Sequence, residues 1–396
     1  MGVAQEGTGT RTAAAFSACR LRAATWALRA QFLVAGALFA TWGVHVPSVK
    51  SHYGLDEQSL AIAMMASGVG SVLALLYAGK LLAHRSPRRT APVLALVCTG
   101  SIGSLLVPSD YAWLLVLMLA YGTAAALFDV AINDEATTIE RQVGRPLMSG
   151  FHGMFSLGGM AGAAAWSLLA SAGASPMHHL VGAAGALVLL ALAASAFMLR
   201  QDRRGGGGSS TLSLPRGPLL LLGLLAAFGL IAEGAMYDWS VLYLRQELDA
   251  PSGVASLAYA SFSAAMAAGR FAGDWVRARM ARVALLRSSG ALGAIGMALT
   301  LSAPHPWVAL AGFALVGLGF ANVVPVLFSA AGQVQGVAPA SGIAAVSSVG
   351  YFGMMVGPPV IGFIAQARSL TVGLLVVVVF AVAITALSGR ALRRFA

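Results

Sequence analysis

Two pairs of polar side chains in this chain have the residue types and the spacing for proton chemistry. Asp129 and Asn133 are four residues apart inside one long apolar stretch. Glu233 and Tyr237 have the same spacing inside another. Residues four apart share one face of a helix, so the two groups of each pair would lie side by side. Because burial favours the protonated form of a carboxyl group, the carboxylate of each pair could bind and release a proton near neutral pH.

Other polar residues lie in similar apolar stretches. Each ionisable group at membrane depth costs about 2.5–3.5 kcal/mol, so it is rarely kept without a function. The alternatives are a hydrogen bond that only packs helices together and, for Trp and Tyr, anchoring at the membrane surface. We expect proton coupling by Asp129, Glu233 and His152. We expect substrate binding by Trp42, His45, Asn133, Tyr237, Asp238, Trp239 and Asn322.

Position along the apolar stretches divides these candidates by depth, at a rise of about 1.5 Å per helical residue. One group is expected near the cytoplasmic side and consists of Asp129, Asn133 and His152. A second group is expected toward the outer side and consists of His45, Glu233 and Asp238.

The elements that position these residues must be membrane helices. Only 10% of the 396 residues are charged, compared with about 25% in soluble domains. The mean hydropathy is +0.80. A net charge of +11 would suggest a nucleic-acid partner in a soluble protein, but here the basic residues lie in short segments between apolar runs. That distribution favours the lipid bilayer as the partner and no nucleic acid.

Twelve apolar runs are long enough to cross a membrane, which takes about 20 residues each. An even number places both termini on the same side. A polar, glycine-rich segment after the sixth run is typical of a flexible linker. The expected organisation is a leader (1–25), a first six-helix half (26–199), a linker (200–216), a second six-helix half (217–389) and a tail (390–396).

The basic residues also predict orientation. If the N-terminus is cytoplasmic, 22 of the 25 Lys and Arg residues lie in inside segments, leaving Lys50, Arg245 and Arg368 outside. Cytoplasmic segments of membrane proteins carry such an excess. Only Lys50 and Lys80 are lysines, a composition typical of GC-rich bacterial genomes. We therefore expect a bacterial cytoplasmic (inner) membrane with both termini in the cytoplasm.

An internal repeat relates the two halves. Ser149, Gly150 and Ser156 recur as Ser341, Gly342 and Ser348, all at an offset of 192. All of the polar candidates except His152 fall in the first, fourth, seventh and tenth runs, whereas the third, sixth, ninth and twelfth hold none of them. Two parallel repeats with a solute path between them are the architecture of a membrane transporter.

Five segments carry a resemblance to a known family. The chain resembles the major facilitator superfamily, and residues 39–47, 128–133, 144–152, 233–239 and 319–325 are similar to its MosC-like branch, kin to the fucose-permease type of sugar transporter. The resemblance implies an all-α fold with twelve transmembrane helices in two pseudo-symmetric halves. It also implies alternating access, a monomer, and neither cofactor nor metal.

The family's conserved loop after the second helix is only partly present. Gly79, Arg85 and Arg88 match it, but Ala83 and His84 stand where Asp and Arg are usual. Asp274 lies in the equivalent loop of the second half, and Gly357 with Pro358 would bend the eleventh helix. We expect this set to control gating: Gly79, Arg85, Arg88, Asp274, Gly357 and Pro358.

The expected function is secondary active transport of a small polar solute, sugar-, cyclitol- or amino-sugar-like, by alternating access coupled to protons. One alternative is proton-coupled efflux of an amphipathic drug or secondary metabolite, through a pocket lined by Met64, Met65, Met236 and Met266. The other is a membrane receptor or scaffold that does not transport. An enzyme is not expected, because no nucleophile, base and metal-ligand set converges in the sequence.

Overall fold

The computed structural model describes residues 17–82, 85–145, 147–200, 217–337 and 339–393. Every regular element within these ranges is a helix. The first half contains α1 (Ala18–Tyr53), α2 (Glu57–Leu82), α3 (Pro87–Gly103), α4 (Tyr111–Val143), α5 (Met148–Ser171) and α6 (Pro176–Ser195). The second contains α7 (Pro218–Gln246), α8 (Ser252–Phe271), α9 (Gly273–Arg279), α10 (Arg282–Ser302), α11 (Pro306–Phe320), α12 (Val323–Ala331), α13 (Pro339–Ala367) and α14 (Leu370–Leu392).

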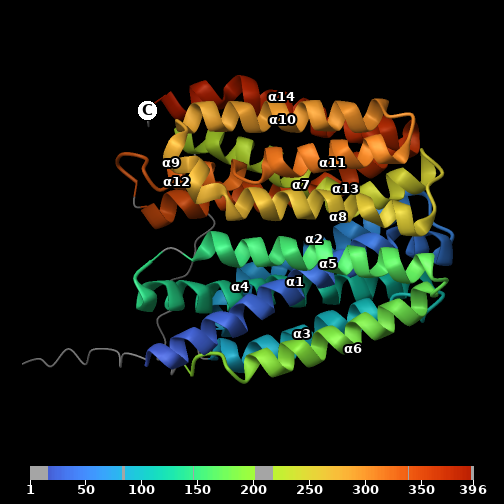
Figure 1. Ribbon diagram of the computed structural model, residues 1–396, viewed down its shortest axis with the longest axis horizontal. Coiled ribbons are helices and arrows are strands. Elements are labelled where there is room, and N and C mark those ends of the chain that lie inside the picture. Colours follow the sequence, from blue (N-terminus) through green and yellow to red (C-terminus); the bar gives the residue numbers. More distant parts are fainter. Residues whose placement is uncertain (1–16, 83–84, 146, 201–216, 338, 394–396) are drawn as a thin grey trace, which may run out of the picture.

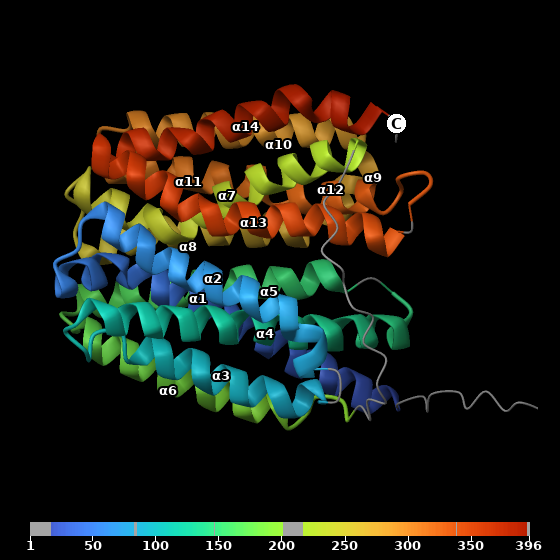
Figure 2. The same ribbon diagram turned by 180° about the vertical axis from the view of Figure 1, so that it is seen from behind.

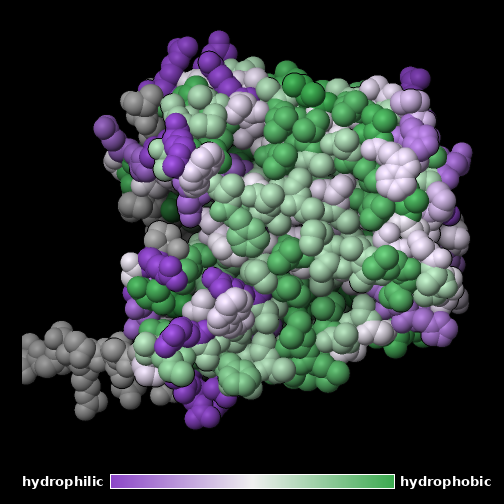
Figure 3. Space-filling model, in the orientation of Figure 1, coloured by the Kyte–Doolittle hydropathy of each residue, from purple (hydrophilic) through white to green (hydrophobic). Residues whose placement is uncertain are grey.

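The long helices run side by side in two bundles, α1–α6 and α7–α14 (Figures 1 and 2). Among the described residues, ten helical segments are long and apolar enough to cross a membrane, with α11 and α12 counted as one. The shorter α3 and the less apolar α8 run alongside them. Figure 3 shows apolar side chains over the middle of the molecule and hydrophilic ones at both ends. The chain is therefore an all-helical, multi-pass membrane protein.

Four helices lie on the outer flanks: α3 and α6 beside the first half, and α10 and α14 beside the second (Figures 1 and 2). The halves meet where α5 packs on α8, α2 on α13 and α1 on α7. The flanking helices correspond to the third, sixth, ninth and twelfth apolar runs. This arrangement explains why those runs hold no acidic residue, whereas α7, which faces the other half, carries Glu233 and Asp238.

Glycines allow the helices of each half to approach closely. A Cβ atom on Gly36 of α1 would lie 1.8 Å from the Phe155 carbonyl oxygen of α5. One on Gly122 of α4 would lie 1.9 Å from the Ser67 carbonyl oxygen of α2. Any larger residue would force these backbones apart, which accounts for part of the high glycine content.

Helix boundaries differ from the predicted spans in several places. Helix α1 begins at Ala18, inside the expected leader, because Ser17 caps it by accepting a hydrogen bond from the Arg20 amide at 3.4 Å. The tenth run is divided between α11 and α12 at residues 321–322. The short helix α9 follows α8, and α14 continues beyond residue 389. Residues 1–16 of the leader and 201–216 of the linker lie outside the described residues.

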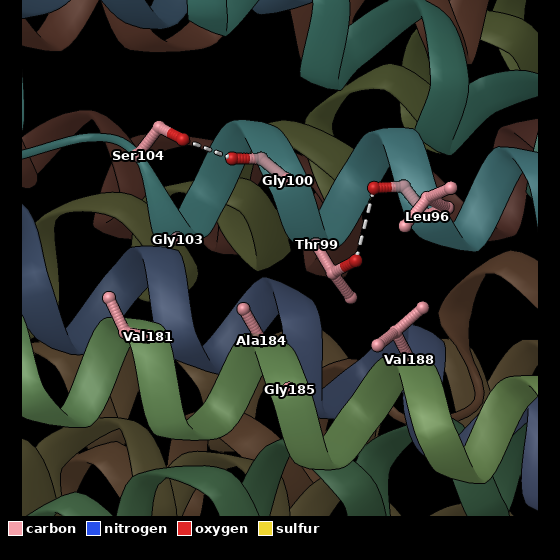
Figure 4. A pocket seen from close by; sticks show the side chains of 9 residues that line it. All are labelled: Leu96, Thr99, Gly100, Gly103, Ser104, Val181, Ala184, Gly185 and Val188. Carbon is pink, nitrogen blue, oxygen red and sulfur yellow. Dashed lines mark hydrogen bonds between the residues drawn. The ribbon is translucent and has the colours of Figure 1, made fainter.

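A groove of about 280 Å³ lies on the outer flank of the first half, between α3 and α6 (Figure 4). Val181, Ala184 and Val188 of α6 point toward α3. The two hydroxyl groups that line it are bonded within α3: Thr99 donates to the Leu96 carbonyl at 3.1 Å and Ser104 to the Gly100 carbonyl at 2.7 Å. The groove is thus apolar and is separate from the interface between the halves.

Candidate functional site

An ion pair lies at the interface between the halves. Arg270 of α8 donates through Nη2 to Glu233 Oε1 of α7 at 2.8 Å. Its Nη1 donates to Ser156 Oγ of α5, in the first half, also at 2.8 Å. Tyr237 donates its hydroxyl to Glu233 Oε1 at 3.0 Å. We call Ser156, Glu233, Tyr237 and Arg270 the ion-pair site.

The ion-pair site connects proton chemistry to the contact between the halves. Glu233 and Arg270 neutralise each other, which offsets the cost of placing each charge away from water. A guanidinium group has donors left over when one carboxylate oxygen is paired. Arg270 uses one of these to bind the opposite half. A change in the charge of Glu233 would therefore alter a bond that joins the two halves.

His152 of α5 lies beside the ion-pair site. Its ring packs edge-on against Phe32 of α1, with centroids 5.3 Å apart. It is close enough to Arg270 and Glu233 to interact electrostatically with both. The structure thus brings together His152 and Glu233, which the sequence assigned to different depths.

Asp129 and Asn133 form a pair within α4. Asn133 Nδ2 donates to the Asp129 carboxylate and to the Asp129 carbonyl, each at 2.9 Å. Across the interface, Tyr351 of α13 interacts electrostatically with Asp129 and Glu233 and keeps 42% of its surface exposed.

Aromatic rings from both halves pack next to the ion-pair site. Phe39 of α1 lies 6.4 Å from Tyr237 and 6.0 Å from Tyr121 of α4, measured between ring centroids. Phe155 of α5 also lies 6.4 Å from Tyr237. Tyr259 of α8 lies 5.1 Å from Tyr237. These rings fill the interface around Tyr237.

A second carboxylate of the interface, that of Asp238, follows Tyr237 in α7. Trp42 of α1 donates its indole N–H to Asp238 Oδ1 of α7 at 3.0 Å, so this hydrogen bond also joins the halves. Next to it, a Cβ atom on Gly43 would lie 2.5 Å from the Tyr237 carbonyl oxygen and 2.6 Å from the Tyr259 ring. The two halves are therefore in tight contact at this depth.

Further contacts close the end of the bundle opposite the chain termini. Lys50 forms a 2.9 Å ion pair with Glu57. Gln246 of α7 donates to the Glu57 carboxylate at 3.1 Å, and the Glu57 amide donates to Gln366 of α13 at 3.1 Å. Residues from the second half thus hold the start of α2, and this end of the interface is closed.

His45 lies apart from Glu233 and Asp238, contrary to the expected grouping. Its Nε2 atom is 2.8 Å from His179 Nδ1 of α6, and its ring centroid is 4.4 Å from that of Trp166 of α5. All its contacts among the described residues are within the first half. Its side chain faces α5 and α6 instead of the opposite half.

Two other expected substrate ligands are buried in helix packing. Trp239 has no exposed surface, and its ring lies 3.2 Å from the position of a Cβ atom on Gly362 of α13. Asn322 precedes α12 and donates to the Gly269 carbonyl of α8 at 3.3 Å. In this conformation Asn322 ties the break between α11 and α12 to the end of α8.

Among the residues expected to control gating, Asp274 contacts the opposite half. It pairs with Arg277 and accepts a hydrogen bond from Ser149 of α5 at 3.5 Å. Arg277 also donates to Ser149 at 3.3 Å. These residues join the halves near the chain termini.

Of the other expected gating residues, Arg88 and Gly357 contact residues of their own half. Arg88 donates to the Met198 carbonyl at 3.4 Å, inside the first half, and Arg85 is exposed. Gly79 lies in α2. Helix α13 continues through Pro358, and a Cβ on Gly357 would lie 3.0 Å from Ile231 of α7.

Sequence reasoning missed the role of Arg270. We assigned it to the cytoplasmic basic residues that set orientation, but its side chain is 85% buried and holds the ion pair. The one available signal was its place inside the eighth apolar run, between Gly269 and Phe271. No group of three or more His, Cys, Asp or Glu side chains suited to a metal ion occurs among the residues that the structure describes.

Comparison with known proteins places this fold in a family. The model of the Major Facilitator Superfamily matches residues 30–338. The chain is 35% identical over 345 residues to an uncharacterised MFS-type transporter of Yersinia pestis, covering 87% of this chain and 89% of that protein. It is 31% identical over 363 residues to the membrane protein MosC of Rhizobium meliloti, covering 90% and 88%.

A solved transporter structure has the same fold as this chain. The D-xylose-proton symporter matches with a TM-score of 0.75 over 93% of this chain and 97% of that chain, at 14% sequence identity, which shows a common fold. The relatives with a stated activity are named as transporters, which indicates a transporter and not an enzyme. With a family model over most of its length and two relatives above 30% identity, the chain belongs to the major facilitator superfamily.

Proposed function

We propose that this transporter carries a small polar solute, sugar-, cyclitol- or amino-sugar-like, by alternating access coupled to protons. The observation that carries the proposal is the ion-pair site, where Arg270 binds Glu233 and also Ser156 of the opposite half. Transporters of this architecture move one half against the other around a central site. A proton on Glu233 would remove the charge that holds Arg270, and so change a bond between the halves.

The proposed coupling uses two carboxylates, those of Glu233 and Asp129. Glu233 exchanges its proton in competition with Arg270. Asp129 interacts electrostatically with Tyr351 of the second half. Asn133 can stabilise the charged form of Asp129 through its amide. His152 is a third candidate because it faces the ion pair.

The proposed orientation places both termini in the cytoplasm. The excess of basic residues in the segments on that side supports it. The closed end of the interface, at Glu57 and Gln246, then faces outward. The proposed location is the bacterial inner membrane and the proposed functional unit is a monomer.

The efflux alternative receives less support from the packing. Met65 is 36% exposed on the surface, whereas Met236 and Met266 are fully buried among helices. These methionines therefore do not share one adaptable pocket in this conformation. A receptor or scaffold that does not transport would bind a solute without flux, and the following measurement distinguishes it.

The proposed function is tested by electrophysiology on a solid-supported membrane with the reconstituted protein. Sugars, cyclitols, amino sugars and cationic drugs are applied with and without a pH gradient. We expect a transient current for at least one polyol class, larger when the gradient is present. Currents for drugs alone would favour efflux, and binding without flux would favour the receptor.

Proton coupling predicts a loss of pH response in two variants. Asp129→Asn and Glu233→Gln keep side-chain shape but cannot exchange a proton, so each is expected to flatten the dependence of transport rate on pH. The measurement is the initial uptake rate across a pH series. Asp110→Asn is the matched control, because Asp110 caps α4 outside the interface and Asn also caps helices well. A wild-type pH response in both interface variants would refute the assignment.

A further inference from the structure

The carboxylate of Asp238 lacks a cationic partner. Glu233 is neutralised by Arg270 at 2.8 Å. In the described part of the chain, no Lys, Arg or His nitrogen lies within 4 Å of the Asp238 carboxylate, and its hydrogen-bond donor is the neutral indole of Trp42. An uncompensated carboxylate at membrane depth is costly and marks a place where a positive group would be favourable.

Two tyrosine hydroxyls near Asp238 are buried and have no hydrogen-bond partner among the described residues. They belong to Tyr121 of α4, in the first half, and Tyr259 of α8, in the second. Both rings are almost fully buried, at 3% and 0% exposure. Both interact electrostatically with Asp238. Because a buried hydroxyl without a partner costs about 1–3 kcal/mol, these groups favour a ligand that can bond to them.

Other aromatic rings pack against both tyrosines. Tyr259 packs 5.1 Å from Tyr237, and Tyr121 packs 6.0 Å from Phe39, centroid to centroid. The Trp42 indole bonds to Asp238 from a third direction. The faces of aromatic rings attract cations, and cages of aromatic rings bind ammonium groups. We call Trp42, Tyr121, Asp238 and Tyr259 the Asp238 site.

We propose that the Asp238 site binds a protonated amine of the transported solute. The proposal rests on the proposed function and narrows its substrate class to amine-bearing polyols. The ammonium group pairs with the Asp238 carboxylate. The hydroxyls of Tyr121 and Tyr259 then bond to the solute's own hydroxyl groups.

The Asp238 site can bind a ligand only when the two halves separate at the closed end of the interface, the end that Glu57 and Gln246 hold together. Trp42 and Tyr121 belong to the first half, and Asp238 and Tyr259 to the second. In the closed arrangement Trp42 occupies Asp238 Oδ1. The indole therefore replaces the ligand when the interface closes, and the solute moves toward the ion-pair site.

The test compares matched ligands that differ in one group. Binding of glucosamine and of glucose, and of an aminocyclitol and of its parent cyclitol, is measured by titration calorimetry on the purified protein. We expect the amine of one pair to bind about 10- to 100-fold more tightly, as for a hydrogen bond to a charged group. In Asp238→Asn the ratio of the two affinities is expected to fall to about one.

Two further variants and one control complete the design. Tyr121→Phe and Tyr259→Phe keep the rings and remove the hydroxyls, so each is expected to weaken amine binding about 2- to 10-fold. Asp56→Asn is the control: a hydrogen bond from Ser59 lowers the pKa of this exposed carboxyl below its usual range, so the substitution also removes a negative charge. It is expected to keep the wild-type ratio.

The outcomes separate this proposal from the proposed function. A ratio near one in the wild type, or an equal loss for both ligands in Asp238→Asn, overturns the amine site and leaves polyol transport standing; the equal loss would indicate a proton-binding or packing role for Asp238. If neither ligand of any pair binds the wild type, the polyol substrate class itself fails, and the amine site fails with it.

Discussion

Replacing Arg270 with Met is expected to abolish transport and to destabilise the protein by about 3–5 kcal/mol, because it leaves the Glu233 carboxylate buried without its counter-charge. The variant also removes the bond from Arg270 to Ser156 of the opposite half. Uptake into proteoliposomes measures the first effect and thermal unfolding in detergent the second. Arg279→Met is the matched control, because Arg279 is exposed and stacks on Trp275 at the surface. Its expected effect on stability is within about 0.5 kcal/mol.

A double variant separates the structural role of the pair from its functional role. Arg270→Met with Glu233→Gln removes both charges, and such neutral replacements of buried pairs are often tolerated. We expect stability to return to within about 1 kcal/mol of wild type while transport stays absent. If Arg270→Met alone were as stable as the double variant, Glu233 would have another partner and the ion-pair site would be wrong.

Much of the fold follows from the sequence because hydrophobic length is a strong signal in membranes. A helix must be about 20 apolar residues long to cross the bilayer, and the helices coincide with the predicted runs to within a few residues at most ends. The break at residues 321–322 was missed because 306–331 is continuously apolar. Hydropathy measures transfer into lipid and does not report where a helix hydrogen bond is interrupted.

The site was less predictable, since the side-chain partners come from different helices. Helical spacing correctly paired Asp129 with Asn133 and Glu233 with Tyr237, which are each four residues apart. It could not show that Arg270 reaches Glu233 from α8, because Arg270 adjoins a basic segment that orientation already explains. It also could not show that His45 faces His179. Depth can be read along one helix, but the direction of a side chain depends on how helices pack.

The contact between halves at Gly43 predicts a shift of conformation. Gly43→Ile places a branched side chain where a Cβ atom alone would lie 2.5 Å from the Tyr237 carbonyl oxygen and 2.6 Å from the Tyr259 ring. Overpacking of this kind costs about 1–3 kcal/mol. Because Gly43 and both contacts belong to different halves, the strain is relieved when the halves separate at this end. The open arrangement should therefore gain about 5- to 150-fold in population relative to the closed one, and transport should fall.

Spin labels measure this shift directly. The pair Ser51→Cys and Ala367→Cys lies on exposed positions of α1 and α13 at the closed end, one in each half. The natural Cys19 and Cys98 are replaced first. In Gly43→Ile the label-to-label distances are expected to lengthen. Gly36→Ile is the matched control, because Gly36 packs on Phe155 within the first half, so it should lower thermal stability without lengthening those distances. Unchanged distances in a folded Gly43→Ile protein would mean that the Gly43 contact does not hold this end closed.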